Sequence, residues 1–550
     1  MRLRPTLWIL ASLLGGTHAS ALQDSPAESE PESSSVERPD GVRPAPDRTE
    51  GVGPFERLIV RGCTMIDGTG SPPFGPVDVV IEGNRIAEIR AVGTPGIGIT
   101  ATDRPGDADH VIEAEGWWLL PGIVDLHVHT GGVPKAPAAE YAYKLWLAHG
   151  ITTVRGVPSG PLEWELSERA RSSRNEITAP RIVSFQRPGS GAEWKDRKVR
   201  TPADAIEWVE YAAAKGVDGL KLGAYPPDVM AALLATANRL NMGSTAHLGQ
   251  MGVAQMNALD AARLGLTGMT HFYGLFEALY DGYDVQPWPT DVNYLDEQHR
   301  FGQVARQWDK IHPRGSDEGD ALLAEFLELD FYVNPTMTIY SAGRDVMRAR
   351  TADWHAEYTL PSLMEFFEPS RLDHGSYWFD WTTADEVAWK NFYRVWMSFL
   401  NDYKNRGGKV TVGSDSGFIY QTYGFGTILE LELLQEAGFH PLEVVRAATM
   451  HGAMELMAPT GSPIDRGVVR EGLLADLFLV EENPLQNLKV LYGTGAVRLN
   501  DATGRPERVG GVRYTIKDGI VYDAKALLAD VAEMVDAQER ALAASPARED

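Results

Sequence analysis

The 550-residue sequence contains only one cysteine, Cys63. A single thiol cannot form a disulfide within the chain, so a disulfide framework is excluded. Cys63 also lies too far from the N-terminus to serve as the lipid-bearing cysteine that follows a signal peptide. The fold must therefore be stabilised without covalent cross-links.

Basic residues are scarce relative to acidic ones. The chain has 51 lysines and arginines against 76 aspartates and glutamates, which gives a formal net charge of −25. A phosphate backbone or an anionic membrane needs a basic face, so this balance argues against both partners. With 43% hydrophobic and 23% charged residues, the composition is typical of a globular protein. A chain of 550 residues is too long for one simple core, so we expect two or more structural units.

No apolar run is long enough to span a bilayer. The run Thr6–Leu14 follows Arg2 and Arg4 and precedes the small-residue site Ala19–Ala21. This order is typical of a secretory signal peptide. We therefore expect residues 1–21 to be removed, and a soluble periplasmic or extracellular protein to begin near Leu22.

Residues 22–54 are rich in Ser, Pro, Glu and Asp, which predicts a disordered leader. Short strand-like runs follow in residues 55–117 and return in residues 467–525. Gly83-Asn84 and Asp518-Gly519 indicate hairpin turns in these two segments. We expect one small β-sandwich domain built from both chain ends, with two separate β appendages as the alternative. Residues 526–550 are expected to form a C-terminal helix and tail.

The middle of the chain, residues 118–466, alternates strands with helices. Eight such units are the number found in a (β/α)8 TIM-like barrel, so the predicted fold class is α/β. The strand candidates are residues 119–130, 151–157, 181–185, 218–223, 243–248, 267–273, 331–336 and 409–415. Two connections, residues 274–330 and 337–408, are long and rich in aromatic side chains. We interpret them as partly helical lid insertions over the barrel mouth.

The first of these strands ends in two histidines, His127 and His129. Residues two apart on a strand point to the same side, so both imidazoles converge on one point. Such a pair forms half of a metal site, although a single buried histidine is more often a hydrogen-bonded core residue.

Four further candidates lie on or at the ends of later strands, where barrel enzymes collect their catalytic groups. They are Lys221, His247, His271 and Asp415. Seven other histidines lie on helices or in the insertions, and we expect most of them at the surface; they are His149, His299, His312, His355, His374, His440 and His451.

At these residues the chain resembles the amidohydrolase superfamily, and specifically its imidazolonepropionase-like and prolidase-like members. The similarity rests on the motifs Pro-Gly-Ile-Val-Asp-Leu-His-Val-His, Gly-Ile-Thr-Thr-Val-Arg, Val-Asp-Gly-Leu-Lys, Thr-His-Phe-Tyr-Gly and Gly-Ser-Asp-Ser-Gly. It covers roughly residues 55–525. One departure is Gly156, since relatives usually carry an acidic residue after the arginine that corresponds to Arg155.

The resemblance implies two divalent metal ions. His127, His129 and Asp415 would hold one ion, His247 and His271 would hold the other, and Lys221 would bridge them as a carboxylated lysine. Zinc fits these ligands best, with manganese, cobalt and iron as alternatives.

The implied reaction is hydrolysis of an amide bond, as in a dipeptide or an N-acyl amino acid, by a metal-bridging hydroxide with Asp415 moving the proton. Tyr225 and Arg155 are candidate substrate-binding residues. Cyclic-amide hydrolysis, heterocycle deamination and a catalytically inactive binding protein on the same fold are the alternatives. We expect a small-molecule substrate, no nucleic acid, no membrane span, and a homo-oligomer as a candidate assembly.

Overall fold

The computed structural model describes residues 41–544, apart from 100–101, 133–134, 196, 250–251, 254, 284–285, 294, 372–374 and 377. The predicted signal peptide, residues 22–40 of the predicted leader, and the tail 545–550 lie outside the described residues. Within the described part, none of the helices combines the length and the apolar character needed to cross a bilayer.

The centre of the molecule is an eight-stranded parallel sheet whose strands follow one another in chain order. The sheet curls until its first and last strands meet. Two hydrogen bonds join them: Leu126 N–H donates to Val412 O at 2.9 Å, and Asp415 N–H donates to His127 O at 2.9 Å. Each predicted strand segment overlaps one of its strands: β6 (Ile123–Val128), β7 (Ile151–Gly156), β8 (Arg181–Gln186), β9 (Gly219–Leu222), β10 (Gly243–Ala246), β11 (Gly268–Thr270), β12 (Tyr332–Asn334) and β13 (Lys409–Val410). The predicted barrel-type α/β fold is confirmed.

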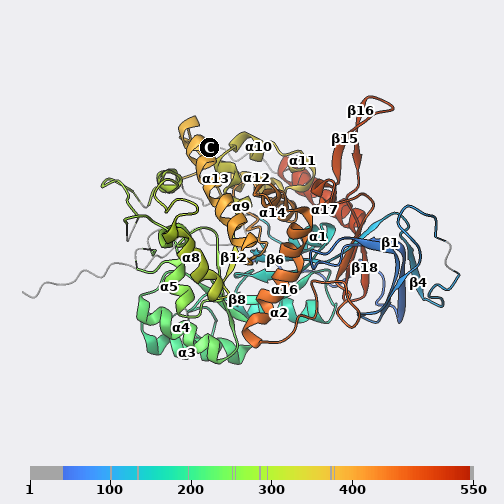
Figure 1. Cartoon of the computed structure of the whole chain (residues 1–550), viewed down its shortest axis with the longest axis horizontal. Coiled ribbons are helices and arrows are strands. Elements are labelled where there is room, and N and C mark those ends of the chain that lie inside the picture. The colour runs from blue at the N-terminus through green and yellow to red at the C-terminus, as the bar shows by residue number, and fades with distance from the viewer. Residues whose placement is uncertain are drawn as a thin grey trace, which may run out of the picture.

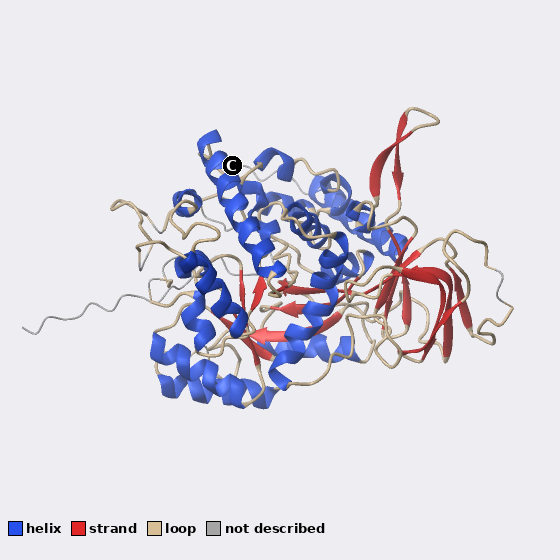
Figure 2. Ribbon diagram, viewed as in Figure 1, coloured by secondary structure: helices blue, strands red, loops and turns tan. Residues whose placement is uncertain are grey.

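Helices surround this sheet, and Figure 2 shows them outside the central strands. Those that follow successive strands are α1 (Ala139–Ala148), α2 (Leu162–Ser173), α3 (Pro202–Lys215), α4 (Pro227–Arg239), α5 (Ala258–Arg263), α8 (Asp317–Glu328), α13 (Thr383–Asn405) and α14 (Phe425–Glu436). They are followed by α15 (Pro441–Arg446), η3 (Ala447–His451), α16 (Gly452–Met457) and η4 (Ala458–Thr460). Local sequence fixes their ends: α3 begins after Thr201, which forms a capping box with Asp204, and ends at Gly216 with φ 89°.

A second eight-stranded sheet joins both ends of the described chain. Its strands are β1 (Arg57–Met65), β2 (Phe74–Glu82), β3 (Arg85–Ala91), β4 (His110–Glu113), β5 (Trp118–Pro121), β14 (Leu477–Val480), β17 (Val512–Lys517) and β18 (Ile520–Asp523). Asp518 and Gly519 turn between β17 and β18 with φ of 57° and 78°, as the sequence predicts. All these strands pair within one sheet, so the predicted sandwich of two sheets is not confirmed (Figure 1, right).

The histidine-bearing run therefore divides between two sheets. Its first residues, in β5, pair antiparallel with β14 in the end sheet, and β6 belongs to the barrel. The break lies at Gly122, where a Cβ atom would come within 2.0 Å of Thr152 Oγ1. The barrel strand that carries His127 thus begins at Ile123, directly after Pro121-Gly122.

Residues 41–54 do not behave as the predicted disordered leader. Ala45 is 3% exposed, Arg48 N–H donates to Glu176 O at 2.7 Å, and Val52 pairs with Val521 in β18. Glu50 also forms an ion pair of 2.7 Å with the buried Lys144 of α1. Composition alone predicts disorder here, but these contacts with distant parts of the chain order the segment.

The two long connections are partly helical. The first contains α6 (Leu275–Ala278), α7 (Glu297–Val304), η1 (Ala305–Gln307) and α8; the second contains α9 (Met337–Tyr340), η2 (Ser341–Gly343), α10 (Val346–Arg350), α11 (His355–Tyr358), α12 (Pro361–Phe367) and α13. Trp389 and Trp396 of α13 pack around Phe272, which directly follows a candidate histidine. The second insertion thus packs against the residues that follow β11.

Two elements complete the described chain. After η5 (Leu488–Leu491), the strands β15 (Ala496–Asn500) and β16 (Arg505–Val509) form a hairpin that projects from the body in Figure 1. The helix α17 (Ala524–Ala544) follows β18 and packs on α1. The domain boundaries suggested by the sequence stay predictions.

Candidate metal centre

Three histidines and one aspartate meet where the barrel strands end. The Nε2 atoms of His127, His129 and His271 lie 3.6, 3.4 and 3.8 Å from the carboxylate oxygens of Asp415. His127 and His129 come from β6 and its end, His271 follows β11, and Asp415 follows β13. The donor atoms of His127, His129 and Asp415 all lie within 4.8 Å of one another.

His247 and Lys221 lie beside this group. The His247 ring is 4.7 Å from the His271 ring and stacks on Tyr273 at 4.5 Å. The buried Lys221 donates from Nζ to Thr270 Oγ1 at 3.2 Å, and its charge lowers the pKa of His127 and His271. All six predicted ligands are therefore brought to one region.

The backbone is strained at this site. His271, Thr336 and Asp415 have φ of 67°, 48° and 50°, in the left-handed region that non-glycine residues rarely adopt. For the β-branched Thr336 this conformation is especially costly. Strain of this kind clusters at functional sites, where the surrounding structure enforces it.

Hydrogen bonds orient two of the rings. His129 donates from Nδ1 to Pro158 O at 2.8 Å, which leaves the Nε2 lone pair facing Asp415. Thr336 gives its hydroxyl hydrogen to Pro335 O, so His271 Nδ1 donates to Thr336 Oγ1 at 2.5 Å. Both rings thus hold the tautomer in which Nε2 can bind a cation.

The histidines are neutral at physiological pH. Burial, followed by charge from nearby residues that include Lys221, holds the pKa of His127, His129 and His271 well below 6.5. Neutral imidazole is the form that coordinates metal. Buried imidazoles that aim Nε2 at one carboxylate fit a divalent cation such as zinc.

Asp125 supports the cluster and was missed in the sequence. Its buried carboxylate accepts from His127 N–H and Ser414 N–H, both at 3.1 Å, and from Thr427 Oγ1 at 2.7 Å. Burial raises its pKa. These bonds join the first and last barrel strands beside His127 and Asp415. The available signal was its spacing, two residues before His127 on the same side of the strand.

Arg155, a candidate substrate-binding residue, lies in a buried ion pair. Its side chain is 1% exposed, donates from Nε to Leu126 O at 2.8 Å and pairs with Glu455 of α16 at 2.6 Å. This guanidinium joins β6, β7 and α16, and its role in substrate binding stays a prediction.

The other candidate, Tyr225, lies near the barrel mouth. Burial raises its pKa to about 12, and the charge of Arg187, just after β8, opposes the rise. Burial, Arg187 and Lys135 also lower the pKa of His129. Lys135 lies 3.1 Å above the Phe418 ring. The charges of two loop cations, Arg187 and Lys135, therefore act on His129, and neither residue lies in a sequence motif that would have identified it.

Two histidines expected at the surface are buried. His149 is fully buried, donates from Nδ1 to Leu145 O at 2.7 Å and packs on Phe425. His355 is 8% exposed and hydrogen-bonds through both ring nitrogens, to Thr359 and to Ala349 O. His355 fills a structural position, because local partners satisfy both of its ring nitrogens. His149 is held through Nδ1 alone, and its buried Nε2 has no hydrogen-bond partner among the described residues.

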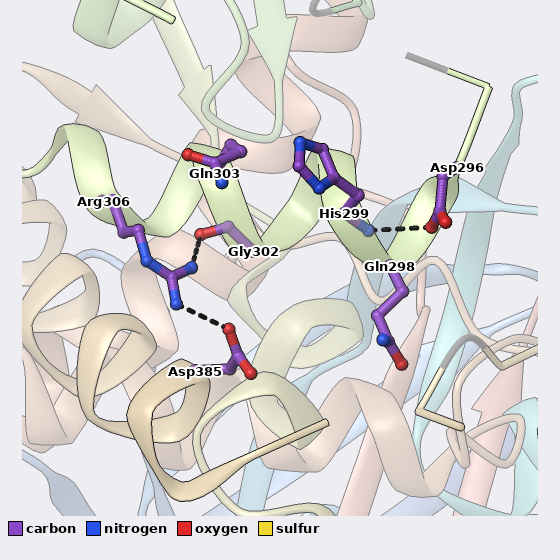
Figure 3. Close-up of a pocket in the computed structure, with 7 residues that line it drawn as sticks. All are labelled: Asp296, Gln298, His299, Gly302, Gln303, Arg306 and Asp385. Carbon is purple, nitrogen blue, oxygen red and sulfur yellow. Dashed lines mark hydrogen bonds and ion pairs between the residues drawn. The ribbon is translucent and has the colours of Figure 1, made fainter. Parts of the chain in front are cut away.

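A separate polar cavity of about 300 Å3 lies between the insertions, where α7 faces the start of α13 (Figure 3). It contains none of the predicted ligands; its lining is Asp296, Gln298, His299, Gly302, Gln303, Arg306 and Asp385. Arg306 donates to Asp385 at 2.8 Å and so ties the two insertions together.

Comparisons with known proteins agree with this architecture. No family model matches the chain. An adenine deaminase from Deinococcus radiodurans is 31% identical over 171 residues, which cover 30% of this chain and only 28% of that protein. A solved Xaa-Pro dipeptidase with bound methionine has a TM-score of 0.53 at 19% identity, covering 85% of this chain and 100% of that one. A bottromycin amidohydrolase structure has a TM-score of 0.60 at 18% identity, covering 88% and 91%. The predicted resemblance to the amidohydrolase superfamily is confirmed.

Proposed function

We propose that this chain, with its amidohydrolase-superfamily fold, is a metal-dependent hydrolase that cleaves a carbon–nitrogen bond. The observation that carries the proposal is the group of three neutral imidazoles whose Nε2 atoms lie 3.4–3.8 Å from the Asp415 carboxylate at the ends of the barrel strands. The proposed ligands are His127, His129, Lys221, His247, His271 and Asp415, with Lys221 carboxylated and two ions, zinc by preference, bound.

The chain's own groups supply the proton transfers. Divalent ions bound here would lower the pKa of water and polarise the substrate carbonyl. Asp415 takes a proton from the attacking water as the new carbon–oxygen bond forms. It then gives that proton to the leaving nitrogen as the carbon–nitrogen bond breaks. Asp125 holds the backbone at His127 and beside Asp415 in place for this step.

The charges at the mouth favour a substrate with a carboxylate beside the amide. The charges of Arg187 and Lys135 act on His129, and Tyr225 lies within the field of Arg187. Tyr273 and Tyr340, which share a hydroxyl–hydroxyl hydrogen bond of 3.0 Å, form an aromatic wall next to His271. A dipeptide or an N-acyl amino acid fits this combination, and the structural likeness to a Xaa-Pro dipeptidase supports it.

Deamination of a heterocycle is the second candidate. It is favoured by the sequence similarity to an adenine deaminase over 171 residues. Amide hydrolysis and heterocycle deamination would use the same proposed metal ligands. They differ in the substrate group that Arg187 and Lys135 would contact.

The test is a metal analysis followed by a paired substrate screen. Each dipeptide and N-acyl amino acid is assayed beside its C-terminal amide, with adenine and cyclic amides in parallel. We expect close to two ions per chain, turnover abolished by a chelator, and a preference for the free carboxylate. A metal-free chain without turnover on any compound would contradict the proposal; turnover of adenine alone would select the deaminase.

A further inference from the structure

A buried carboxyl group outside the metal cluster connects two loops of the site. Glu165 lies on α2, is fully buried, and forms no ion pair among the described residues. Its carboxyl group lies close to the loop of residues 157–161, which links β7 to α2. None of the steps proposed for hydrolysis uses it.

Its carboxyl group fills the space that a side chain at position 156 would need. A Cβ atom on Gly156 would lie 2.1 Å from Glu165 Oε1, 2.7 Å from Ser159 Oγ and 2.8 Å from Ser159 N. Glycine at this position therefore lets the Glu165 carboxyl reach the end of β7 and the backbone of the following loop.

This loop sets the orientation of one proposed ligand. Pro158 O accepts from His129 Nδ1 at 2.8 Å, and Ser159 O accepts from Thr130 N–H at 3.2 Å. The loop thus holds the ring of His129 and the backbone beside it. A shift of the loop would rotate His129 Nε2 away from Asp415.

Glu165 also connects to the loop that carries Arg187. The amide of Gln186, the last residue of β8, donates to Glu165 Oε2 and to Gly160 O, the latter at 3.3 Å. Ser190 Oγ donates to Gln186 Oε1 at 3.3 Å. Gln186 directly precedes Arg187. The Glu165 carboxyl group therefore connects the loop that orients His129 with the segment that carries Arg187.

We propose that Glu165 is a positioning residue that fixes His129 and Arg187 through the Ser159 loop and Gln186. The inference rests on the proposed function, because it assigns the group that holds one ligand and one substrate-facing cation. Burial raises the pKa of Glu165 to about 8, with Ser159 and Arg169 opposing and Asp218 adding to the rise. Glutamine is neutral and similar in shape, so the variant Glu165→Gln should keep the positioning function.

The experiment compares four variants with the parent: Glu165→Leu, Glu165→Gln, Gly156→Ala and, as a control, Ser167→Ala on the exposed side of the same helix. The metal-free proteins are titrated with zinc against a chelating dye, and circular dichroism checks folding. Loss of a group that orients a metal ligand typically costs about 10- to 100-fold in metal affinity.

We expect Glu165→Leu and Gly156→Ala to weaken zinc binding about 10-fold or more, while Glu165→Gln and the control stay within about threefold. With a carboxylate substrate, Glu165→Leu and Gly156→Ala should also raise KM, because the loss of the Glu165 contacts would displace Arg187. If Glu165→Leu does not fold, Gly156→Ala and Glu165→Gln decide.

Folded Leu or Ala variants with parental zinc affinity would overturn this inference and leave the proposed function intact. A Gln variant as defective as Leu would overturn the neutral positioning role. A parent that binds no zinc would overturn the proposed function, and with it this inference.

Discussion

The buried pair of Arg155 and Glu455 gives the prediction that separates a structural from a substrate-binding arginine. Both side chains are 1% exposed, and their 2.6 Å ion pair is extended by Arg155 Nε to Leu126 O and by Thr411 Oγ1 to Glu455 Oε2 at 2.9 Å. Replacing Arg155 by methionine leaves the Glu455 charge buried without its partner.

Breaking a buried pair from one side costs about 3–5 kcal/mol, whereas replacing both partners with apolar residues is often close to neutral. We therefore expect Arg155→Met to lower the Tm by roughly 3–5 °C, because the entropy of unfolding of a chain this long is about 1 kcal/mol per kelvin. The double variant Arg155→Met/Glu455→Leu should recover more than half of that loss. KM of the folded single variant should stay within about twofold of the parent, because the Arg155 side chain is bonded to Glu455 and to Leu126 O.

Differential scanning calorimetry of parent, single and double variants, with steady-state kinetics on each, provides the measurement. A substrate-binding arginine predicts the reverse pattern, in which the Tm is unchanged and KM rises at least about 10-fold. That pattern would refute the structural assignment of Arg155.

Three further predictions concern the ligand set and the chain start. Asp125→Ala should lower both the zinc content and the Tm. Asp125→Asn should lower them less, because asparagine keeps one acceptor for His127 N–H and Ser414 N–H. Equal losses of zinc from the two variants, measured by inductively coupled plasma mass spectrometry, would exclude this bridging role. Lys221→Ala should reduce bound metal below two ions per chain, and short carboxylic acids should partly restore turnover; a variant with two ions and normal turnover would disprove carboxylation of Lys221. The exported protein should begin near Leu22 in N-terminal sequencing, and material that begins at Met1 would count against the signal peptide.

Local patterns predicted the barrel and its histidines well. The first barrel strand is a short, mostly apolar run that begins after Pro121-Gly122, and the two-residue period of β6 places His127 and His129 on one side. The strands' parallel order then brings His271 and Asp415 to the same end of the sheet. The predicted turn at Asp518-Gly519 likewise depends only on local conformation.

Features that depend on distant contacts could not be predicted in this way. Asp125 and Arg155 both lie on strands near the site, and only the partners Ser414 and Glu455, hundreds of residues away, show that they support it. Residues 41–54 are ordered by α1, α2 and β18 despite a polar composition. Glu165 likewise acquires its role from the space left at Gly156.

The central claim is that Asp415 moves the proton in a metal-dependent hydrolysis. The most direct test is turnover by Asp415→Asn after reconstitution with excess zinc, since asparagine keeps the size and one oxygen ligand but cannot accept a proton at neutral pH. We predict a folded protein with close to two ions and at least roughly 100-fold lower turnover, the range typical of a positioned general base. Turnover that falls only in proportion to lost metal and recovers as zinc is added would contradict the claim.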